Sequence, residues 1–517
     1  QQAEELSAAQ EPTEPQELPE LAELSASPEL STPEELEEPA EDQPEQEQTD
    51  PPPDEALPAA SSHVPDPPPL PITTRAHPSR QRRSRIPFVA ALLILMCLVG
   101  VGMLFSSHFF DTAASGGSGT GLGFVPALSP DAPIVQPPFT SAQMAEIMHL
   151  SGYMKDKALA SLYVAHMTLD EELGQLIMVE YDSGCYTGTC SNATSYYSPD
   201  LDTMLNTLHA GGVIMYEFQM QNFPQTKNDI AEMQRRAGIP LLIATDEEGG
   251  PYVHRLSHIY GYRMSATDIA NTGDPNIAAQ QGAKAAQDLL SLGINVNLAP
   301  DVDVNLVNGY DMVTRTFGST PQAVVKFASS YLEALQGDGV IGTIKHFPGL
   351  GDAVTDAHTT LPVVNRTRDQ LYSVELAPFK AFIQTSNPLM YPGIIMPTDV
   401  LMPAIDPVYP AELSHTFMTD ILRNEFGYDG VVLTDALYMQ GIIEKWDMNT
   451  AAVLALNAGN DMLLGPTGAG QMLSMINALK AALANGTLSK ARIDQAATRI
   501  ITLKMEYHLM PAAPPQE

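Results

Sequence analysis

The chain is poor in cysteine and in positive charge. Its 517 residues include three cysteines, and no Cys-x-x-Cys pair occurs among them. Three cysteines are too few for a disulfide-based fold, and the missing spacing excludes the common paired-cysteine zinc motifs. Lysine and arginine number 26 against 62 aspartates and glutamates, which gives a formal net charge of −36. Such an acidic chain is a poor candidate for binding nucleic acid, whose phosphates attract Lys and Arg.

The acidic excess is concentrated near the beginning of the chain. The first 70 residues hold 20 of the 62 acidic residues and no Lys or Arg. They are rich in Glu, Pro, Gln and Ser, and such a segment cannot bury enough apolar surface to offset the entropy of ordering. We therefore predict that residues 1–86 are a disordered acidic tail with a basic end. An acidic interaction tail is the functional alternative.

Residues 87–105, PFVAALLILMCLVGVGMLF, carry no charge. Roughly 20 apolar residues suffice for a helix that spans a bilayer. Five arginines precede this run: Arg75, Arg80, Arg82, Arg83 and Arg85. The positive-inside rule then predicts a single-pass protein of the cell membrane, with its tail in the cytoplasm and its remainder outside. A signal peptide would require a much shorter leading segment. Two further interpretations of the run are a lipid-modified Cys97 and a buried core helix.

Residues 106–138 are rich in Gly, Ser and Pro and predict a flexible linker with a stiffer end. Farther along, Cys185 and Cys190 flank the short sequence YTGT. We expect them to form a disulfide outside the membrane, with two free thiols as the alternative. Residues 509–517 are expected to be disordered.

Between residues 139 and 508 the composition becomes that of a globular domain. Short apolar runs alternate with amphipathic stretches such as 275–293, 321–337 and 411–427, the last with Gly427 as its predicted C-cap. The expected strands are 173–181, 211–218, 240–248, 294–302, 340–347, 389–397, 430–437 and 460–466. Eight such units predict an α/β fold, a (β/α)8 TIM barrel. An open doubly wound sheet is the alternative, which the absence of a Gly-x-Gly-x-x-Gly after the first strand disfavours.

Polar side chains collect where the predicted strands end, which is where a barrel carries its chemistry. They are Asp246, Glu247 and Glu248; Asp301, Asp303 and Arg315; Lys345, His346, Asp352, Asp356 and His358; Thr398 and Asp399; and Thr434 and Asp435. Carboxylates and charged donors in one mouth suit the recognition of sugar hydroxyls. Glycosidic cleavage needs a carboxylate on one face of the sugar and a proton donor at the leaving oxygen. Asp435 and the pair Asp356 and His358 fit those two roles, although an aspartate at a strand end is often only a helix cap.

Six segments in order resemble the family 3 glycoside hydrolases, and within them the single-domain β-N-acetylglucosaminidases. They are TDEEGG (245–250), GINVNLAPDVDVN (293–305), RTFG (315–318), KHFPGLGDAVTDAH (345–358), PAELS (410–414) and GYDGVVLTDALYMQGI (427–442). They resemble the family patterns D-Q-E-G-G, G-[IV]-N-x-N-x-A-P-V-x-D-V, R-T-F-G, K-H-F-P-G-H-G followed by D-S-H, P-A-[ST]-L-S, and G-F-x-G-[VI]-[VI]-x-[ST]-D-x-L-x-M-x-[AG]-I. The resemblance covers most of residues 140–508.

The resemblance implies a role for each matching residue. Asp435 matches the nucleophile that forms a covalent glycosyl-enzyme. His358 matches the general acid/base on a mobile loop, and Asp356 would orient its imidazole. The residues that match those holding the sugar are Asp246, Arg255, Arg315, Lys345 and His346. Arg315 and Lys345 would also help to keep Asp435 ionised.

The chain departs from the family pattern at several positions. Leu350 replaces a histidine, Ala357 a serine and Ala436 a frequent aspartate. After Gly250 the chain reads PYVHRL where the family has R-V-x-R-[LF], so one arginine is missing and Arg255 lies one residue farther along. The assignment of Arg255 is therefore the least secure.

The leading hypothesis is a retaining exo-β-N-acetylglucosaminidase that acts on cell-wall or chitin-type saccharides. The triplet Asp356–Ala357–His358 motivates it, because the family members specific for glucosides or xylosides usually take their acid/base from a second domain. A family 3 β-glucosidase or a phosphorylase is one alternative, since a neutral histidine does not repel phosphate. A catalytically inactive sugar-binding module is another. No metal-ligand spacing and no phosphate-binding loop occurs, so no metal and no cofactor is expected.

Overall fold

The computed structural model describes residues 143–144, 147, 150–181, 195–307 and 312–510. The predicted tail (1–86), apolar helix (87–105) and linker (106–138) lie outside these residues, as do Cys185 and Cys190. Within the described residues, none of the helices combines the length and the hydropathy that a bilayer crossing requires. The predicted domain boundaries at 139 and 508 stay predictions.

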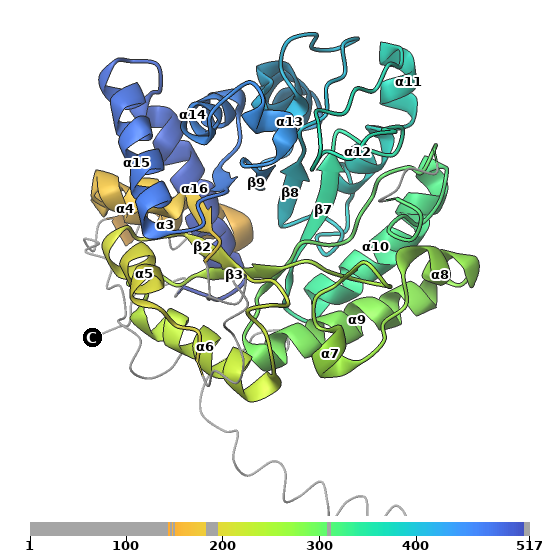
Figure 1. Ribbon diagram of the computed structural model, residues 1–517, viewed down its shortest axis with the longest axis horizontal. Coiled ribbons are helices and arrows are strands. Elements are labelled where there is room, and N and C mark those ends of the chain that lie inside the picture. Colours follow the sequence, from red (N-terminus) through yellow and green to blue (C-terminus); the bar gives the residue numbers. More distant parts are fainter. Residues whose placement is uncertain (1–142, 145–146, 148–149, 182–194, 308–311, 511–517) are drawn as a thin grey trace, which may run out of the picture. The chain divides into compact units, whose positions relative to one another are not determined.

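Eight parallel strands close into a barrel (Figure 1). They are β1 (Ile177–Val179), β2 (Gly212–Ile214), β3 (Leu242–Thr245), β6 (Val296–Asn297), β7 (Ile341–Phe347), β8 (Ile394–Pro397), β9 (Val431–Ala436) and β10 (Met462–Leu464). Each strand pairs with the next one along the chain, and β10 closes the barrel by pairing with β1. The predicted (β/α)8 barrel is confirmed.

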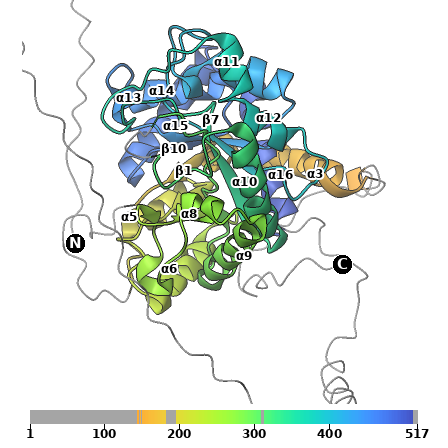
Figure 2. The ribbon, with the colours of Figure 1, turned by 90° about the vertical axis from the view of Figure 1, so that its right-hand side faces the viewer.

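Helices surround the strands on the outside, as the two views of the ribbon show (Figures 1 and 2). The longer ones are α3 (Gly152–His166), α6 (Phe223–Arg236), α9 (Pro275–Leu292), α10 (Pro321–Gly337), η3 (Thr416–Glu425), α14 (Met448–Ala458), α15 (Ala469–Ala484) and α16 (Lys490–Glu506). The shorter ones are α4 (Leu169–Gln175), α5 (Pro199–Asp202), η1 (Thr203–Thr207), α7 (Ser257–Tyr260), α8 (Ala266–Asn271), α11 (Arg368–Ser373), α12 (Ala377–Ile383), η2 (Ala411–Leu413) and α13 (Gln440–Ile443).

The strands are apolar because both of their faces are covered, one by the barrel interior and the other by the helices. All residues of β7 and β8 are buried, for example. Every predicted strand is present, and all eight are shorter than predicted. In the first, residues 173–175 belong to the end of α4, where Thr168 and Glu171 form a capping box at the helix start.

The predicted amphipathic stretches 275–293 and 321–337 form α9 and α10, and each helix begins after a capping residue. Asp274 caps α9 ahead of Pro275, and Gly293 ends that helix with a φ of 96°. Thr320 caps α10 in the same way. The stretch 411–427 differs, because it splits into a 3-10 turn (η2) and a π-helix (η3).

The split of that stretch has a local cause at Ser414. The backbone of this residue is extended, and its hydroxyl oxygen accepts the backbone N–H of Phe417 at 3.3 Å. Ser414 thus caps the second segment instead of continuing the first. Gly427 follows the C-cap residue Phe426 with a φ of 86°, close to its predicted capping position.

The parallel arrangement brings all eight carboxyl ends of the strands to one end of the barrel. A small antiparallel hairpin, β4 (Glu247–Gly249) and β5 (Val253–His254), follows β3 at this end. The predicted polar residues therefore gather around one mouth.

Candidate active site

Asp435 lies in β9 near the carboxyl end of the strand. Its carboxylate accepts two hydrogen bonds from nearby residues. The hydroxyl of Thr398, which follows β8, donates to Oδ2 at 3.0 Å, and the backbone N–H of Ala436 donates to Oδ1 at 2.8 Å. The backbone N–H of Asp435 donates to Oε2 of Glu412 at 3.1 Å. These bonds fix both the backbone and the carboxylate of the residue that matches the family's nucleophile.

Two further carboxyl groups lie next to Asp435, and both are buried. Burial, followed by the charge of Asp435, raises the pKa of Asp399 to about 8. Burial and the charges of Asp399 and Asp435 raise the pKa of Glu412 well above its usual value. At neutral pH, Asp399 is therefore mainly protonated, and the pKa of Glu412 is shifted in the same direction.

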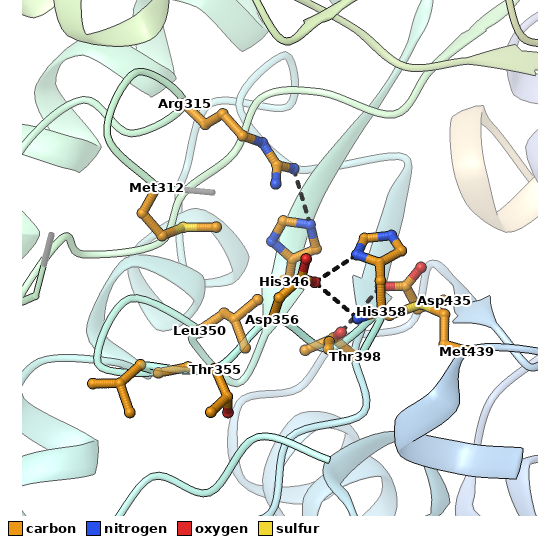
Figure 3. A pocket seen from close by; sticks show the side chains of 13 residues that line it. Met312, Arg315, His346, Leu350, Thr355, Asp356, His358, Thr398, Asp435 and Met439 are labelled. Atoms are coloured by element: carbon orange, nitrogen blue, oxygen red, sulfur yellow. Dashed lines mark hydrogen bonds and ion pairs between the residues drawn. The ribbon is translucent and has the colours of Figure 1, made fainter. Parts of the chain in front are cut away.

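The loop after β7 brings Asp356 and His358 to the cavity that Asp435 also lines (Figure 3). Nδ1 of His358 lies 2.8 Å from Oδ1 of Asp356, which also accepts the backbone N–H of His358 at 2.8 Å. This leaves Nε2 as the ring atom that can exchange a proton with a bound molecule. Asp356, His358 and Asp435 line one small cavity of about 40 Å³. The other acidic residue of this loop, Asp352, is not among the residues lining it.

Lys345 and Arg315 are both paired with carboxylates. Nζ of Lys345 lies 2.7 Å from Asp246 and 2.8 Å from Glu248. Arg315 donates from Nε and from a terminal nitrogen to the two oxygens of Glu248, each at 2.9 Å. The structure therefore pairs these two cations with Asp246 and Glu248, and their support of the charge of Asp435 stays a prediction.

The charges of this network are held fixed at neutral pH. Burial raises the pKa of Asp246, but the nearby charges of Lys345 and Arg255 outweigh burial and bring it below its usual value. Burial acts in the same way on Glu248, whose pKa the charges of Arg315 and Lys345 hold well below the usual range. Such a rigid set of donors and acceptors suits a polyol, whose hydroxyls both donate and accept.

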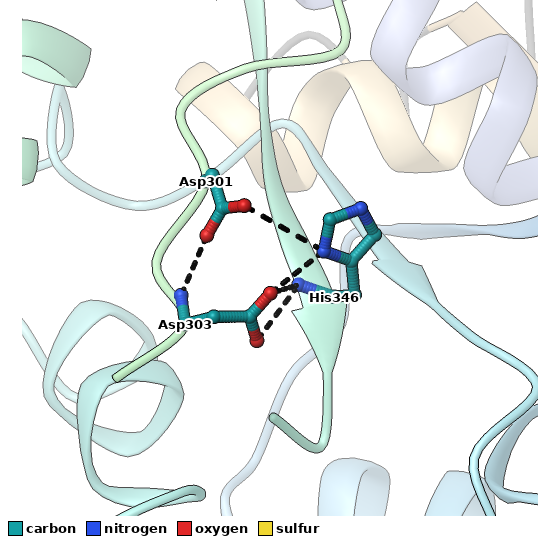
Figure 4. Close-up of side chains that lie close together, drawn as sticks. All are labelled: Asp301, Asp303 and His346. Carbon is teal, nitrogen blue, oxygen red and sulfur yellow. Dashed lines mark hydrogen bonds and ion pairs between the residues drawn. The ribbon is translucent and has the colours of Figure 1, made fainter. Parts of the chain in front are cut away.

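His346 is oriented by two aspartates that follow β6 (Figure 4). Its Nδ1 lies 2.7 Å from Oδ2 of Asp303 and 3.8 Å from Oδ2 of Asp301. A terminal nitrogen of Arg315, which is always a donor, lies 3.3 Å from Nε2. The contacts thus fit a neutral imidazole with its proton on Nδ1, donated to Asp303.

Asp301, Asp303 and His346 are also the one group of described side chains with the spacing of metal ligands. The geometry favours an orienting role instead. Asp303 already forms a hydrogen bond with the ring Nδ1 of His346, and it accepts a second one from the backbone N–H of Leu350 at 2.7 Å. Arg315 supplies a fixed positive charge 3.9 Å from Asp301. Burial and the charge of Asp303 raise the pKa of Asp301 to about 8, so that it is mainly neutral at pH 7.

Arg255 joins the site from the hairpin β4–β5. It pairs with Glu217 at 3.3 Å, and its guanidinium lies 5.6 Å from the ring centre of Tyr216. The unusual sequence before Arg255 forms the turn of the hairpin, so Tyr252 stands at its tip. The extra residue is therefore absorbed in the turn, and Arg255 still reaches the mouth.

A second change in the same segment is compensated inside the protein. Glu247 stands where the family pattern has Gln, and its carboxylate is fully buried. It pairs with His254 on the opposite strand of the hairpin and with Arg263, whose Nε lies 3.0 Å away. These partners satisfy a buried charge that the glutamine of the pattern would not carry.

All the predicted site residues except Asp356 line one cavity of about 280 Å³ at the mouth. This cavity and the small cavity that Asp356 lines share Arg315, His346, His358 and Asp435. A larger cavity of about 550 Å³ lies at the other end of the barrel, near Gly393 and Gly430, and none of the predicted site residues lines it.

Four residues that the structure brings into the site have no individual role in the family resemblance: Glu248, Asp303, Thr398 and Glu412. Glu248 and Asp303 lie in matched motifs, and only the bonds they make distinguish them from neighbouring acids. Glu412 carried a signal, because an acidic residue replaces the Ser or Thr of P-A-[ST]-L-S. Burial first, and then the neighbouring carboxyl groups of Asp399 and Asp435, raise the pKa of this glutamate well above its usual value.

Comparison with known proteins gives a consistent result. A family model described as the glycosyl hydrolase family 3 N terminal domain matches residues 168–503. The Beta-hexosaminidase A of Pseudoalteromonas piscicida is 34% identical over 333 residues, 58% of this chain and 54% of that protein. The Beta-hexosaminidase of Idiomarina loihiensis is 35% identical over 258 residues, 49% of this chain and 75% of that protein.

A solved structure of a glycoside hydrolase family 3 beta-N-acetylglucosaminidase, from Paenibacillus sp. str. FPU-7, is similar with a TM-score of 0.60. It is 33% identical, and the match covers 66% of this chain and 63% of that one. The chain thus spans about half the length of the first curated relative and under two thirds of this structure.

Proposed function

Because this chain belongs to glycosyl hydrolase family 3, we propose that it is a retaining exo-glycosidase that hydrolyses terminal β-N-acetylglucosamine residues. One observation carries the proposal: an Asp–His pair on the loop after β7 and a carboxylate on β9 line the same cavity. A histidine on this loop supplies a proton donor from within the barrel domain. The names of the hexosaminidase relatives support the choice of sugar.

The first step joins the sugar to Asp435. Its ionised carboxylate attacks the anomeric carbon while protonated His358 donates its Nε2 proton to the glycosidic oxygen. The bond between that carbon and oxygen breaks, the aglycone leaves as an alcohol, and a glycosyl ester of Asp435 forms. Asp399, whose pKa is raised to about 8, is mainly neutral beside Asp435 at pH 7.

The second step releases the sugar and restores the enzyme. Neutral His358 removes a proton from water, the water oxygen attacks the anomeric carbon, and Asp435 departs as a carboxylate. Two inversions at this carbon give net retention of configuration. Asp246, Arg255, Arg315, Lys345 and His346 would hold the sugar hydroxyls and the acetamido group through both steps.

The experiment is to assay the full chain on the 4-nitrophenyl β-glycosides of N-acetylglucosamine, glucose and xylose. Hydrolysis of the N-acetylglucosaminide alone supports the proposal, and added phosphate that accelerates turnover into a sugar phosphate would identify a phosphorylase. Turnover of the glucoside instead would overturn the choice of sugar. The absence of all turnover would favour the inactive sugar-binding module.

Chemical rescue tests the two roles separately. Asp435→Ala and His358→Ala should each lose most activity, on the order of 10²-fold or more. Added azide should rescue Asp435→Ala with an α-glycosyl azide as product, because azide then attacks the sugar directly. The same anion should rescue His358→Ala with a β-glycosyl azide, because it attacks the glycosyl-Asp435 ester. The same anomer from both variants would contradict the assignment.

We also propose that residues 87–105 anchor the protein in the cell membrane, with its N-terminus in the cytoplasm and its barrel outside. The uncharged apolar run and the arginines before it support this orientation. The full chain should resist extraction by alkaline carbonate, and a protease added to intact cells should digest the barrel domain. A chain that lacks residues 87–105 is the control, and a full chain extracted as readily as this control would contradict the anchor.

A further inference from the structure

One wall of the 280 Å³ cavity at the mouth is aromatic and tightly held. Tyr216, which follows β2, stacks on Phe218 with ring centres 5.8 Å apart and planes 13° from parallel. Arg255 covers Tyr216 from the hairpin. The rings and the guanidinium thus support one another, and little side-chain entropy would be lost when a ligand binds against them.

Tyr438 extends this wall toward Asp435. It follows β9, and its hydroxyl donates to Oε2 of Glu180 at 2.8 Å. It is also hydrogen-bonded to Tyr216. These two bonds anchor the polar tip of Tyr438, while 37% of the residue remains exposed. Its ring is a fixed surface in the cavity that also contains the proposed nucleophile.

Tyr252 stands on the hairpin that lines the same cavity. It is 62% exposed, and it occupies the turn where the family pattern has an arginine and no inserted residue. An exposed aromatic ring at a sugar-binding mouth offers a flat apolar face. The axial hydrogens on one face of a β-linked pyranose pack well against such a ring.

The cationic side chains of the mouth are paired with carboxylates. Each Lys or Arg that lines this cavity already has a carboxylate partner: Lys345 has Asp246, Arg315 has Glu248 and Arg255 has Glu217. The side chain of Glu217 is 58% exposed, and Glu180 lies beside Tyr438 on the same wall. A ligand ring that bears a carboxylate would lie near two glutamates that contact the lining residues Arg255 and Tyr438, with no unpaired Lys or Arg among the described lining residues.

We propose that Tyr252 and Tyr438 form an aglycone subsite that takes an uncharged sugar ring, such as the second unit of a β-linked N-acetylglucosamine chain, and disfavours a sugar that carries a carboxylate. The proposal rests on the proposed function, because the aglycone is defined by the sugar held next to Asp435. Among the cell-wall and chitin-type saccharides that we expect as substrates, the proposal favours neutral, chitin-like chains.

The test compares a substrate that has an aglycone ring with one that has none. N,N′-diacetylchitobiose presents a second sugar to the subsite, whereas N-acetyl-β-glucosaminyl azide has a leaving group without a ring. Tyr252→Ala should lower the ratio of kcat/KM for chitobiose to kcat/KM for the azide about tenfold, the loss expected for one stacking contact. Tyr252→Phe should keep the ratio, because a phenyl face stacks as well.

Tyr262→Ala is the matched control. Tyr262 is 72% exposed and is thus similar in exposure to Tyr252, which is 62% exposed. Unlike Tyr252, Tyr262 does not line the cavity. Its removal should leave both rates unchanged. An unchanged ratio in Tyr252→Ala, with azide hydrolysis intact, overturns the subsite and leaves the proposed function standing. Failure of the unsubstituted enzyme to cleave either substrate overturns the proposed function itself.

The charge selectivity has its own measurement. We expect a disaccharide with N-acetylmuramic acid as its second sugar to be cleaved on the order of tenfold more slowly than chitobiose at low ionic strength, with a smaller difference at high salt. Glu217→Gln should narrow the difference, because it removes one glutamate and releases Arg255. Equal or faster cleavage of the acidic disaccharide by the unsubstituted enzyme would overturn the selectivity.

Discussion

Oδ1 of Asp356 holds His358 twice, at 2.8 Å from the ring Nδ1 and at 2.8 Å from the backbone nitrogen. The ring is nevertheless mostly exposed, so this carboxylate is its main support. We predict that Asp356→Ala lowers kcat/KM for chitobiose on the order of 10²-fold, because proton donation requires an oriented imidazole. The loss should be much smaller with a 2,4-dinitrophenyl leaving group, which needs no proton.

The control for this prediction lies on the same loop. Asp352 is an acid four residues before Asp356 and does not line the small cavity. Asp352→Ala should therefore keep the rates on both substrates. If Asp356→Ala slowed both substrates equally, its role would be structural and not the support of proton transfer.

A second prediction concerns Glu248, which neutralises two cations at once. It accepts two bonds from Arg315 and lies 2.8 Å from Lys345, and all three side chains are largely buried. Glu248→Ala would remove the bidentate partner of Arg315 and leave Lys345 with Asp246 alone, so we expect the free energy of unfolding to fall by about 3–5 kcal/mol. KM should rise as well, because both donors belong to the proposed sugar site.

Urea denaturation of Glu248→Ala and Glu232→Ala side by side checks this expectation. Glu232 also pairs with two arginines, Arg235 and Arg236, but on the protein surface. Exposed ion pairs contribute little, so this variant should unfold close to the unsubstituted protein. Equal losses in the two variants would mean that burial of the Glu248 cluster is not what matters.

The barrel could be predicted from the sequence because its signals are local and repeated. Apolar runs at the strands, amphipathic stretches between them and the ordered motifs each agreed with the others. The strand ends were less accurate. Residues 173–175, for example, continue the helix before β1, because a capping box farther back starts that helix. Tertiary contacts, which the sequence does not display, decide such boundaries.

The site could be predicted where the type of residue alone indicates a role. It was harder to predict where the role of a residue depends on the side chain with which it pairs. Asp435, His358 and Asp356 lie together as expected. The division of the cations among Asp246, Glu248 and Glu217 needed three-dimensional contacts, since the partners come from different strands. The roles of all these residues stay predictions until the variants are measured.

A third prediction follows from the raised pKa of Asp399, about 8 in the folded protein against an ordinary value of 3.8. Between these two pH values the folded state keeps a proton that the unfolded chain has released. The stability that this group contributes is therefore present below about pH 4 and is lost as the pH rises toward 8. Asp399→Asn, which stays neutral, should remove this loss, at most about 1.4 kcal/mol for each pH unit.

Urea unfolding of both proteins between pH 5 and pH 8 measures this difference. Asp301, Glu375 and Glu506 also have raised pKa values, so the unsubstituted protein should lose stability over this range for several reasons. The comparison with Asp399→Asn isolates one of them. Parallel curves for the two proteins would show that Asp399 ionises as easily in the folded state as in the unfolded chain.

A fourth prediction concerns Gly441, where the helix α13 meets the site. A Cβ at this position would lie 1.9 Å from Oδ2 of Asp399, and the backbone N–H of Gly441 donates to the carbonyl of Ala357 at 3.4 Å. Alanine here would push apart the helix, Asp399 and the loop that carries His358. We expect Gly441→Ala to lose about 1–3 kcal/mol of stability. We also expect kcat/KM for the N-acetylglucosaminide to fall roughly tenfold or more, because the proton donor would be displaced.

Gly470→Ala separates this effect from the general effect of adding a methyl group. Gly470 lies in α15, and a Cβ on this residue would meet no neighbouring atom within 4 Å. Alanine there should keep activity and leave stability unchanged or slightly higher, since it restricts the unfolded chain. Thermal unfolding and kcat/KM of both variants decide the matter. If Gly441→Ala behaved like Gly470→Ala, α13 would be free to shift without disturbing Asp399 or the loop, and close packing at this contact would not be required for catalysis.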